Sequence, residues 1–265
     1  YLWLMSYFDK PWGQPYYPIS QYYKSTFGCK VYKIPVSVSG TCPNREGLRG
    51  MKTCNFCDVW GSAAYPEIRE QGLSEQIATT RSRMRKMYNA KKFLVYFQAY
   101  THTFDKVQKL REDFEIALGF EDVVGVVVGT RPDCLSKAVL ELWTETIQKG
   151  AFVGVELGVQ TFDEEQLIWM RRGHSAQRSI WAIHKISEQA PEVNLGIHLM
   201  FGLPNETNEQ IVKSADTVNQ LPVHNVKLHN LHVLKNTPLE QDYLRGEFKP
   251  IDRATYFDRC RLFLE

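Results

Sequence analysis

Apolar residues along the chain fall into short continuous runs that alternate with longer segments of helical periodicity. Short runs rich in Val, Ile, Leu and Phe are typical of strands that are buried on both faces. They predict six strands, at residues 31–38, 92–98, 123–129, 151–158, 193–201 and 224–232. The intervening periodicity predicts helices at about 74–89, 104–118, 136–149, 163–189 (where Gly173 can break the helix) and 207–220, and a last helix from Asp252.

Strict alternation of strand and helix predicts an α/β fold, because parallel strands need right-handed crossover helices between them. A doubly wound sheet and a partial barrel are both compatible with six such units. Both place active residues at the carboxyl ends of the strands. Polar residues follow several of the predicted strands, and we therefore expect one shared site at that edge. Ser74 and Asp163 are expected to cap the helices that they precede.

The first 30 residues differ in composition from the rest. Positions 1–28 are crowded with proline and aromatic residues. We therefore divide the chain into an irregular aromatic-rich lead-in, residues 1–30, packed on one domain formed by residues 31–265. The first residue is not Met, and the chain stops within a helical pattern. Both observations leave open that the natural start and a C-terminal portion are missing.

Composition limits the class of protein only broadly. The 265 residues suffice for one large domain, and 43% hydrophobic with 23% charged residues is typical of a soluble globular protein. A formal net charge of +2 neither requires nor excludes nucleic acid. No run of about 18 apolar residues indicates a membrane span, and the N-terminus lacks the pattern of a signal peptide. We therefore expect no association with a membrane.

Three clustered cysteines indicate a metal centre: Cys42, Cys54 and Cys57, directly after the first predicted strand. Thiolates bind zinc, copper(I) and iron–sulfur clusters. A structural zinc needs four protein ligands, which a distant histidine could complete here. A four-iron cluster held by three thiolates would keep one iron open. The remaining cysteines, Cys29, Cys134 and Cys260, are expected to be buried small residues or surface thiols. Metal-binding and free thiols together favour a reducing compartment, the cytoplasm.

Further motifs make the chain resemble one superfamily. A loop ending Cys-x-aromatic-Cys after the first of six strand–helix units resembles the radical S-adenosylmethionine (SAM) enzymes. Eleven residues separate Cys42 from Cys54, a departure shared with the branch that resembles the Elongator catalytic subunit. From about Gly28 to the end the chain resembles the YhcC/YtqA type, in Tyr96-Phe-Gln-Ala-Tyr-Thr101, Gly129-Thr-Arg-Pro-Asp-Cys-Leu135, Val155-Glu-Leu-Gly-Val-Gln-Thr161, Arg172-Gly-His174, Gly202-Leu-Pro204 and His232-Val-Leu-Lys-Asn-Thr-Pro-Leu239.

The resemblance implies a partial (β/α)6 TIM-like barrel over residues 31–265, with a [4Fe-4S] cluster held by Cys42, Cys54 and Cys57 in the loop after strand 1. It implies SAM as the second cofactor, cleaved to a 5′-deoxyadenosyl radical that abstracts hydrogen from the substrate. The protein then orients the cofactor and excludes competing reactions. A reductant such as flavodoxin or ferredoxin is the implied partner, and side-chain modification of the tRNA wobble uridine is the implied reaction.

The resemblance also assigns roles to single residues. Phe56 and Leu203 would flank the adenine, Gln98 and Tyr100 would lie near the methionyl amine, Gln160 would contact the ribose and Arg172 the carboxylate. Thr130 and Glu156 complete the implied cofactor set. Packing is the alternative for Phe56, a plain turn for Leu203, and an ion pair with Arg131 or another basic residue for Glu156. A polar substrate pocket is predicted from Arg131, His198, Lys227, His229, His232 and Lys235.

Two other enzyme or binding functions remain compatible with these residues. The radical chemistry could act on a small metabolite, or the chain could be a zinc or iron–sulfur binding module without turnover. The basic run at residues 81–86 could bind phosphate, although a solvated helix face is the better interpretation.

Overall fold

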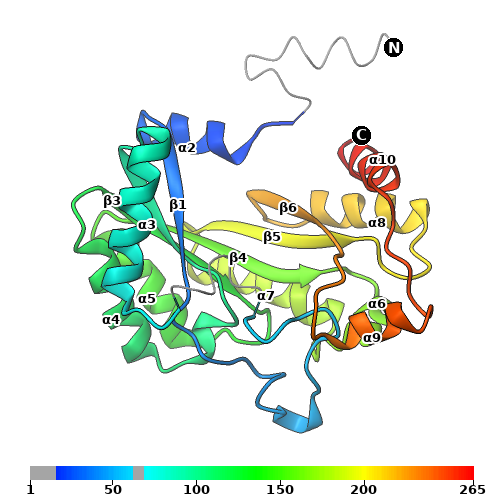
Figure 1. Cartoon of the computed structure of the whole chain (residues 1–265). Helices are drawn as coiled ribbons and strands as arrows, with labels where there is room; N and C mark the ends of the chain where they lie inside the picture. Colours follow the sequence, from blue (N-terminus) through cyan, green and yellow to red (C-terminus); the bar gives the residue numbers. More distant parts are fainter. Residues whose placement is uncertain (1–15, 62–68) are drawn as a thin grey trace.

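The computed structural model describes residues 16–61 and 69–265, which form a curved sheet covered by helices (Figure 1). Its six strands follow one another in sequence order, and all neighbouring pairs are parallel. This confirms the predicted α/β fold, with the strands forming a half-barrel. The strands are β1 (Val31–Val36), β2 (Lys92–Phe97), β3 (Val123–Thr130), β4 (Phe152–Gln160), β5 (Asn194–Phe201) and β6 (Asn225–Asn230).

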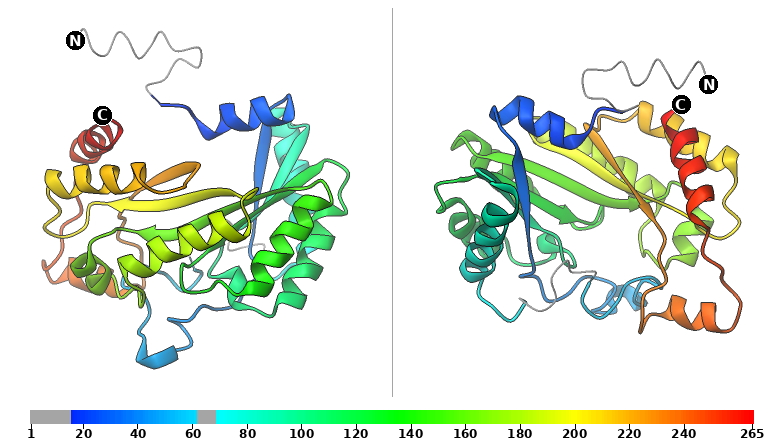
Figure 2. Two further views of the ribbon diagram at one scale, coloured as in Figure 1. Left: turned by 180° about the vertical axis from the view of Figure 1, so that it is seen from behind. Right: turned by 45° about the horizontal axis from the view of Figure 1, so that its top comes forward.

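Helices line the convex side of the sheet, as the view from behind shows (Figure 2). They follow the strands as crossovers, as predicted: α3 (Leu73–Tyr88), α4 (Val107–Leu118), α5 (Lys137–Gln148), α6 (Glu164–Trp169), α7 (Ala176–Gln189) and α8 (Asn208–Asn219). Two further helices, α9 (Pro238–Leu244) and α10 (Arg253–Leu264), end the chain. The sequence pattern predicted α10 but missed α9.

The main core lies between the sheet and these helices. On β4, the side chains of Val153, Val155 and Leu157 are fully buried there, together with Trp143 of α5 and Ile183 of α7. Because side chains alternate along a strand, the residues between them face the concave side of the sheet. Glu156 is one of these, which places a carboxylate on the inner face of the half-barrel.

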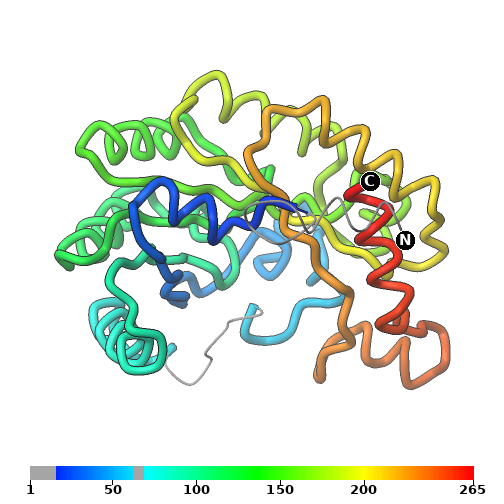
Figure 3. The backbone as a smooth tube through the Cα atoms, turned by 90° about the horizontal axis from the view of Figure 1, so that it is seen from above, coloured from blue at the N-terminus to red at the C-terminus, as the bar shows by residue number. Residues whose placement is uncertain are grey.

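Part of the lead-in corrects the sequence prediction. Residues 19–27 form helix α2 (Ile19–Phe27), not an irregular segment, and Gly28 ends it with a φ of +73°. Seen from above, α2 lies inside the arc of the outer helices (Figure 3). Its Tyr23 is 5% exposed and packs against Phe152 with ring centroids 5.9 Å apart. The aromatic residues before position 16, including Trp12, lie outside the described residues.

Several helix boundaries differ from the prediction for local reasons. The long helix predicted at 163–189 is two helices, α6 and α7, because Gly173 adopts a φ of +72° between them. Asp163 caps α6 as predicted, accepting a hydrogen bond from the backbone of Gln166 at 3.0 Å. Ser74 does not cap α3, whose N-cap position is Gly72. The segment His102–Phe104 forms the 3-10 helix η3, which delays the start of α4.

None of the helices within residues 16–61 and 69–265 has the length and apolar character needed to cross a bilayer.

Candidate cluster and cofactor site

The loop after β1 carries all three clustered cysteines and lies beneath the sheet in Figure 1. It includes the short 3-10 helix η1 (Leu48–Gly50). Cys54 is buried, and its sulfur lies 3.5 Å from Nη1 of Arg172, which donates a hydrogen bond to it. Cys57 receives a hydrogen bond from Arg45 at 3.8 Å. Two of the three thiols therefore have guanidinium groups beside them. Burial raises the pKa of the Cys57 thiol, and the hydrogen bond and charge of Arg45 offset this only in part.

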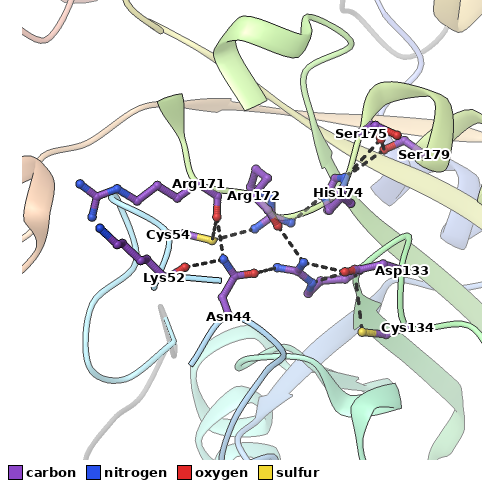
Figure 4. Close-up of polar contacts among 12 residues, drawn as sticks. Asn44, Lys52, Cys54, Asp133, Cys134, Arg171, Arg172, His174, Ser175 and Ser179 are labelled. Carbon is purple, nitrogen blue, oxygen red and sulfur yellow. Dashed lines mark hydrogen bonds and ion pairs between the residues drawn. The ribbon is translucent and has the colours of Figure 1, made fainter. Parts of the chain in front are cut away.

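Asn44 fixes this loop to the ends of other strands (Figure 4). Its amide nitrogen donates to the backbone oxygens of Lys52 and Arg171, both at 2.6 Å, and its side-chain oxygen accepts from Arg131. The residue is 2% exposed. Because an amide offers two N–H donors and an acceptor oxygen, Asn44 joins the cysteine loop to the segments after β3 and β4.

Arg131, directly after β3, extends this hydrogen-bond network. Its guanidinium forms two parallel hydrogen bonds of 2.8 Å with Asp133, and it donates to the backbone oxygen of Arg172 at 2.7 Å. Burial alone would raise the pKa of Asp133, but the hydrogen bonds and charge of Arg131 hold this pKa below its usual range. Glu156 was expected, as one alternative, to pair with Arg131 or another basic residue. Arg131 pairs with Asp133 instead, whereas another basic residue, Lys33, does form an ion pair with Glu156.

His174 lies at the other side of the same network. Burial, and then the positive charges of Arg172 and Arg131, lower the pKa of His174 to about 3. The ring is therefore neutral near pH 7. Its Nδ1 atom lies within hydrogen-bonding distance of two atoms at the start of α7. These are the backbone oxygen of Ser175 and the hydroxyl oxygen of Ser179 (Figure 4).

Buried polar atoms without partners surround the cysteine loop, within the part of the chain that the structure describes. They include Nε of Arg172 and Oε1 of Gln160, although both residues are at least nine-tenths buried. Unpaired buried polar atoms are costly and call for an absent partner. Three thiols on one loop, with these atoms beside it, fit an iron–sulfur cluster and a polar organic ligand.

A single metal ion fits the described residues less well. No three His, Cys, Asp or Glu side chains gather closely enough to hold one ion within residues 16–61 and 69–265. A structural zinc site needs four ligands around one ion. The described geometry thus gives no support to the zinc alternative.

The residues expected to flank an adenine come together. Phe56 and Leu203 belong to one apolar cluster, which also contains the fully buried Met170. Arg172 lies over the Phe56 ring at 6.0 Å. Gln160 ends β4 with a φ of +73°, and it lines a cavity of about 220 Å³ between the ends of β4 and β5 and helices α6 and α8.

The three remaining residues near β2 and β3 have other surroundings. Gln98 directly follows β2, and its backbone nitrogen donates to Val36 at 3.4 Å. The Tyr100 hydroxyl donates to the backbone of Val59 at 2.6 Å, so that this side chain packs against the cysteine loop. Thr130 shares a hydrogen bond with Thr103. The Tyr100 and Thr130 hydroxyls are therefore already used within the protein.

A second polar group, which we call the Glu156 layer, lies on the concave face of the sheet. Glu156 forms an ion pair with Lys33, accepts hydrogen bonds of 2.7 Å from Tyr96 and His198, and lies 3.7 Å from Nζ of Lys227. Burial would raise the pKa of Glu156, but the bond from His198 and the charges of the two lysines hold it well below its ordinary value.

The predicted substrate residues divide between two environments. His198, Lys227 and His229 come together as expected, with the rings of the two histidines 4.8 Å apart. His232 and Lys235 are exposed in the loop after β6, since the strand ends at Asn230 rather than at residue 232. Arg131 belongs to the network around the cysteine loop, not to this group.

Sequence reasoning missed several residues of both networks. Lys33 had a detectable signal, because a charged residue interrupts an otherwise apolar strand. Asn44 had none, since polar loop residues are common and only the fold shows their partners. Asp133 lay in the motif Gly129–Leu135, but its pairing with Arg131 was not expected. Tyr96 was noticed in a motif, but its bond to Glu156 was not expected.

Two protein-family models match consecutive parts of the chain. The model of the Radical SAM superfamily matches residues 36–218, and that of the Radical_SAM C-terminal domain matches residues 223–265. The chain is 32% identical over 241 residues to the uncharacterized protein YtqA of Bacillus subtilis, covering 91% of this chain and 74% of YtqA. It is 34% identical over 232 residues to protein YhcC of Escherichia coli, covering 87% and 72%.

More distant similarities include one tRNA enzyme and one solved structure. A tRNA uridine(34) acetyltransferase of Methanocaldococcus infernus is 33% identical over 131 residues, 48% of this chain and 23% of that protein. The solved structure of archaeal Elp3 from the same organism, with residues 1–46 deleted, has the same fold at a TM-score of 0.62 and 19% identity, covering 88% of this chain and 53% of that one. With the superfamily model matched from β1 to α8, and with relatives aligned over most of their length, the chain belongs to the Radical SAM superfamily, in the branch of YhcC and YtqA.

Proposed function

We propose that this chain is a radical SAM enzyme in which Cys42, Cys54 and Cys57 hold a [4Fe-4S] cluster with one open iron for SAM. When bound, the cluster supplies the electron that cleaves SAM to a 5′-deoxyadenosyl radical, which abstracts hydrogen from the substrate. The observation that carries the proposal is the loop of three thiols, with Nε of Arg172 and Oε1 of Gln160 buried and unpaired beside it.

The chain's own residues would orient SAM at this edge of the sheet. Arg172 is held by the backbone oxygen of Gly158 at 2.8 Å and keeps one N–H unpaired, which suits a carboxylate. Phe56 and Leu203 supply an apolar surface for the adenine, and Gln160 supplies an acceptor for a ribose hydroxyl. Buried surroundings exclude water, which protects a reactive intermediate.

Anaerobic reconstitution with iron and sulfide tests this proposal. We expect a brown protein with four irons, which forms 5′-deoxyadenosine from SAM and a strong reductant. Cys42→Ala, Cys54→Ala and Cys57→Ala should each abolish this activity, while the matched variant Cys29→Ala should retain it. A colourless protein that binds zinc and forms no 5′-deoxyadenosine would exclude the proposed chemistry.

For the substrate we propose tRNA, modified at the side chain of the wobble uridine. Support comes from the similarity to tRNA uridine(34) acetyltransferases over about half of this chain. Incubation with total tRNA, followed by mass spectrometry of the nucleosides, should reveal one altered uridine. Binding of tRNA should weaken steeply with salt, because phosphate contacts release counterions. Unaltered nucleosides would exclude tRNA and favour a small metabolite.

The electron donor that we propose is a flavodoxin or ferredoxin in the cytoplasm. All six cysteines are free thiols, which suits a reducing compartment. Replacing dithionite by reduced flavodoxin should sustain formation of 5′-deoxyadenosine.

A further inference from the structure

The Glu156 layer leaves hydrogen-bond donors unused on strand β6. Both carboxylate oxygens of Glu156 already have partners on β1, β2 and β5. Lys227 reaches Glu156 only at 3.7 Å, and its side chain is 45% exposed. The Nε2 atom of His229, two residues further along β6, is buried and has no hydrogen-bond partner within the described residues. These two side chains form the open end of the layer.

The charges of the layer do not balance. Lys33 and Lys227 carry two positive charges and Glu156 one negative charge. Burial lowers the pKa of His198, and burial with the positive charge of Lys227 lowers the pKa of His229 to about 3, so neither ring is charged near pH 7. The layer therefore carries a net charge of +1 on the concave face of the sheet.

The layer also lies close to the cysteine site. Gly158, whose backbone oxygen holds Arg172, is two residues beyond Glu156 on β4. A strand rises about 3.3 Å per residue, so Glu156 lies about 7 Å from Gly158 along β4. A molecule bound against the layer would thus reach toward the face on which Arg172 meets Cys54.

We infer that Lys227 and His229 bind a singly charged anionic group of the substrate, a carboxylate or a phosphodiester, and that Glu156 positions Lys227 for it. The inference rests on the proposed function, because the bound anion is a substrate only if the chain is an enzyme. A lysine ammonium is a compact charge with three donors, which matches either group. One net positive charge is neutralised by one negative charge, which disfavours a dianionic phosphomonoester.

Competitive labelling of lysines in the whole reconstituted chain tests this inference. An amine-reactive reagent is added at constant ionic strength with acetate, with the dinucleotide uridylyl-uridine or with neutral uridine. Mass spectrometry then follows labelling of Lys227 and of the exposed Lys235 as the matched control. We expect acetate or the dinucleotide to slow labelling of Lys227 at least fivefold and to leave Lys235 unchanged. Protection by acetate alone indicates a carboxylate substrate, and protection by the dinucleotide alone indicates nucleic acid.

The variant His229→Gln should raise the anion concentration needed for protection, and its melting temperature shows whether it folds. Protection by uridine alone, or by no probe, would overturn the inference. Formation of 5′-deoxyadenosine is measured on the same preparation. Protection without this product would refute the proposed function and leave the anion site standing, whereas the product without protection would refute only the anion site.

Discussion

Nη1 of Arg172 donates a hydrogen bond to the sulfur of Cys54 at 3.5 Å, although 118 residues separate them in sequence. The guanidinium is fixed by a second bond, from Nη2 to the backbone oxygen of Gly158 at 2.8 Å. β4 thereby places a positive charge beside one proposed cluster ligand. Hydrogen bonds to cysteine sulfurs are among the factors that set the reduction potential of an iron–sulfur cluster.

Replacing Arg172 should therefore change the potential as well as cofactor binding. In Arg172→Gln we expect a lower reduction potential, because the reduced cluster, which carries one more negative charge, loses the cation and the N–H donor beside Cys54. Folding stability should fall by about 1 kcal/mol, since the partly buried backbone oxygen of Gly158 loses its donor. Potentiometric titration followed by electron paramagnetic resonance measures the shift. The neighbouring exposed Arg171 gives the control Arg171→Gln, and equal potentials in both variants would contradict this role.

Loss of Asn44 should free the cysteine loop. Asn44→Leu keeps the side chain's approximate size but removes the bonds to Lys52, Arg171 and Arg131. Leaving the buried guanidinium of Arg131 without this acceptor should cost roughly 1–3 kcal/mol. Amide hydrogen exchange in residues 42–57 should become faster in the protein without cofactors, and iron should be lost sooner after reconstitution. Asn219→Ala, at an exposed position, is the control. Unchanged exchange in Asn44→Leu would mean that the loop holds its conformation without this residue.

The sequence predicted the sheet well because each strand is a short apolar run with its own boundaries. The six strands deviate from their predicted limits by one or two residues. Helix α2 was missed because the proline and aromatic residues crowded into positions 1–28 suggested an irregular segment. Tyr23, packed on Phe152, holds this helix to the sheet. Tertiary contacts of this kind override local propensity and cannot be derived from the segment alone.

The sequence predicted those parts of the candidate site in which a residue type has one common function. Clustered cysteines indicate a metal centre by their chemistry, and the fold adds only their surroundings. Glu156 was ambiguous, because a buried carboxylate requires a partner but the sequence does not name it. The structure supplies Lys33, Tyr96 and His198, which come from three other strands and lie 42 to 123 residues away.

His174 should make folding stability depend on pH. Its pKa is about 3 in the folded protein and about 6.5 ordinarily, so between these values the unfolded chain binds a proton that the folded chain does not. Stability from this group is therefore complete above about pH 6.5 and declines as the pH falls toward 3, by up to about 1.4 kcal/mol per pH unit. Urea denaturation at pH 4.5, 5.5 and 7.5 should show a shallower slope in His174→Gln than in the parent protein. The same substitution at His232, on the exposed loop after β6, is the control. Equal slopes in His174→Gln and the parent protein would contradict the assignment.

Tyr23 should contribute much of the free energy with which α2 packs on the concave face of the sheet. Its ring packs against Phe152, and Nζ of Lys33 lies 5.8 Å from its centroid, so one side chain contacts both the apolar floor of the half-barrel and the Glu156 layer. Truncation of a buried aromatic residue costs about 3–5 kcal/mol, from lost burial and from the cavity left behind.

We expect Tyr23→Ala to lower the free energy of unfolding by about that amount, and Tyr23→Phe to change it by less than about 1 kcal/mol, because the ring remains. Denaturant titrations measure both, with Tyr16→Ala as a control at an exposed position. If α2 did not contribute to the stability of the domain, Tyr23→Ala would unfold only α2 and leave the global unfolding transition unchanged. A loss in the global transition, together with faster labelling of Lys33 by an amine reagent, would instead mean that α2 closes the concave face and shields the ion pair of Lys33 with Glu156.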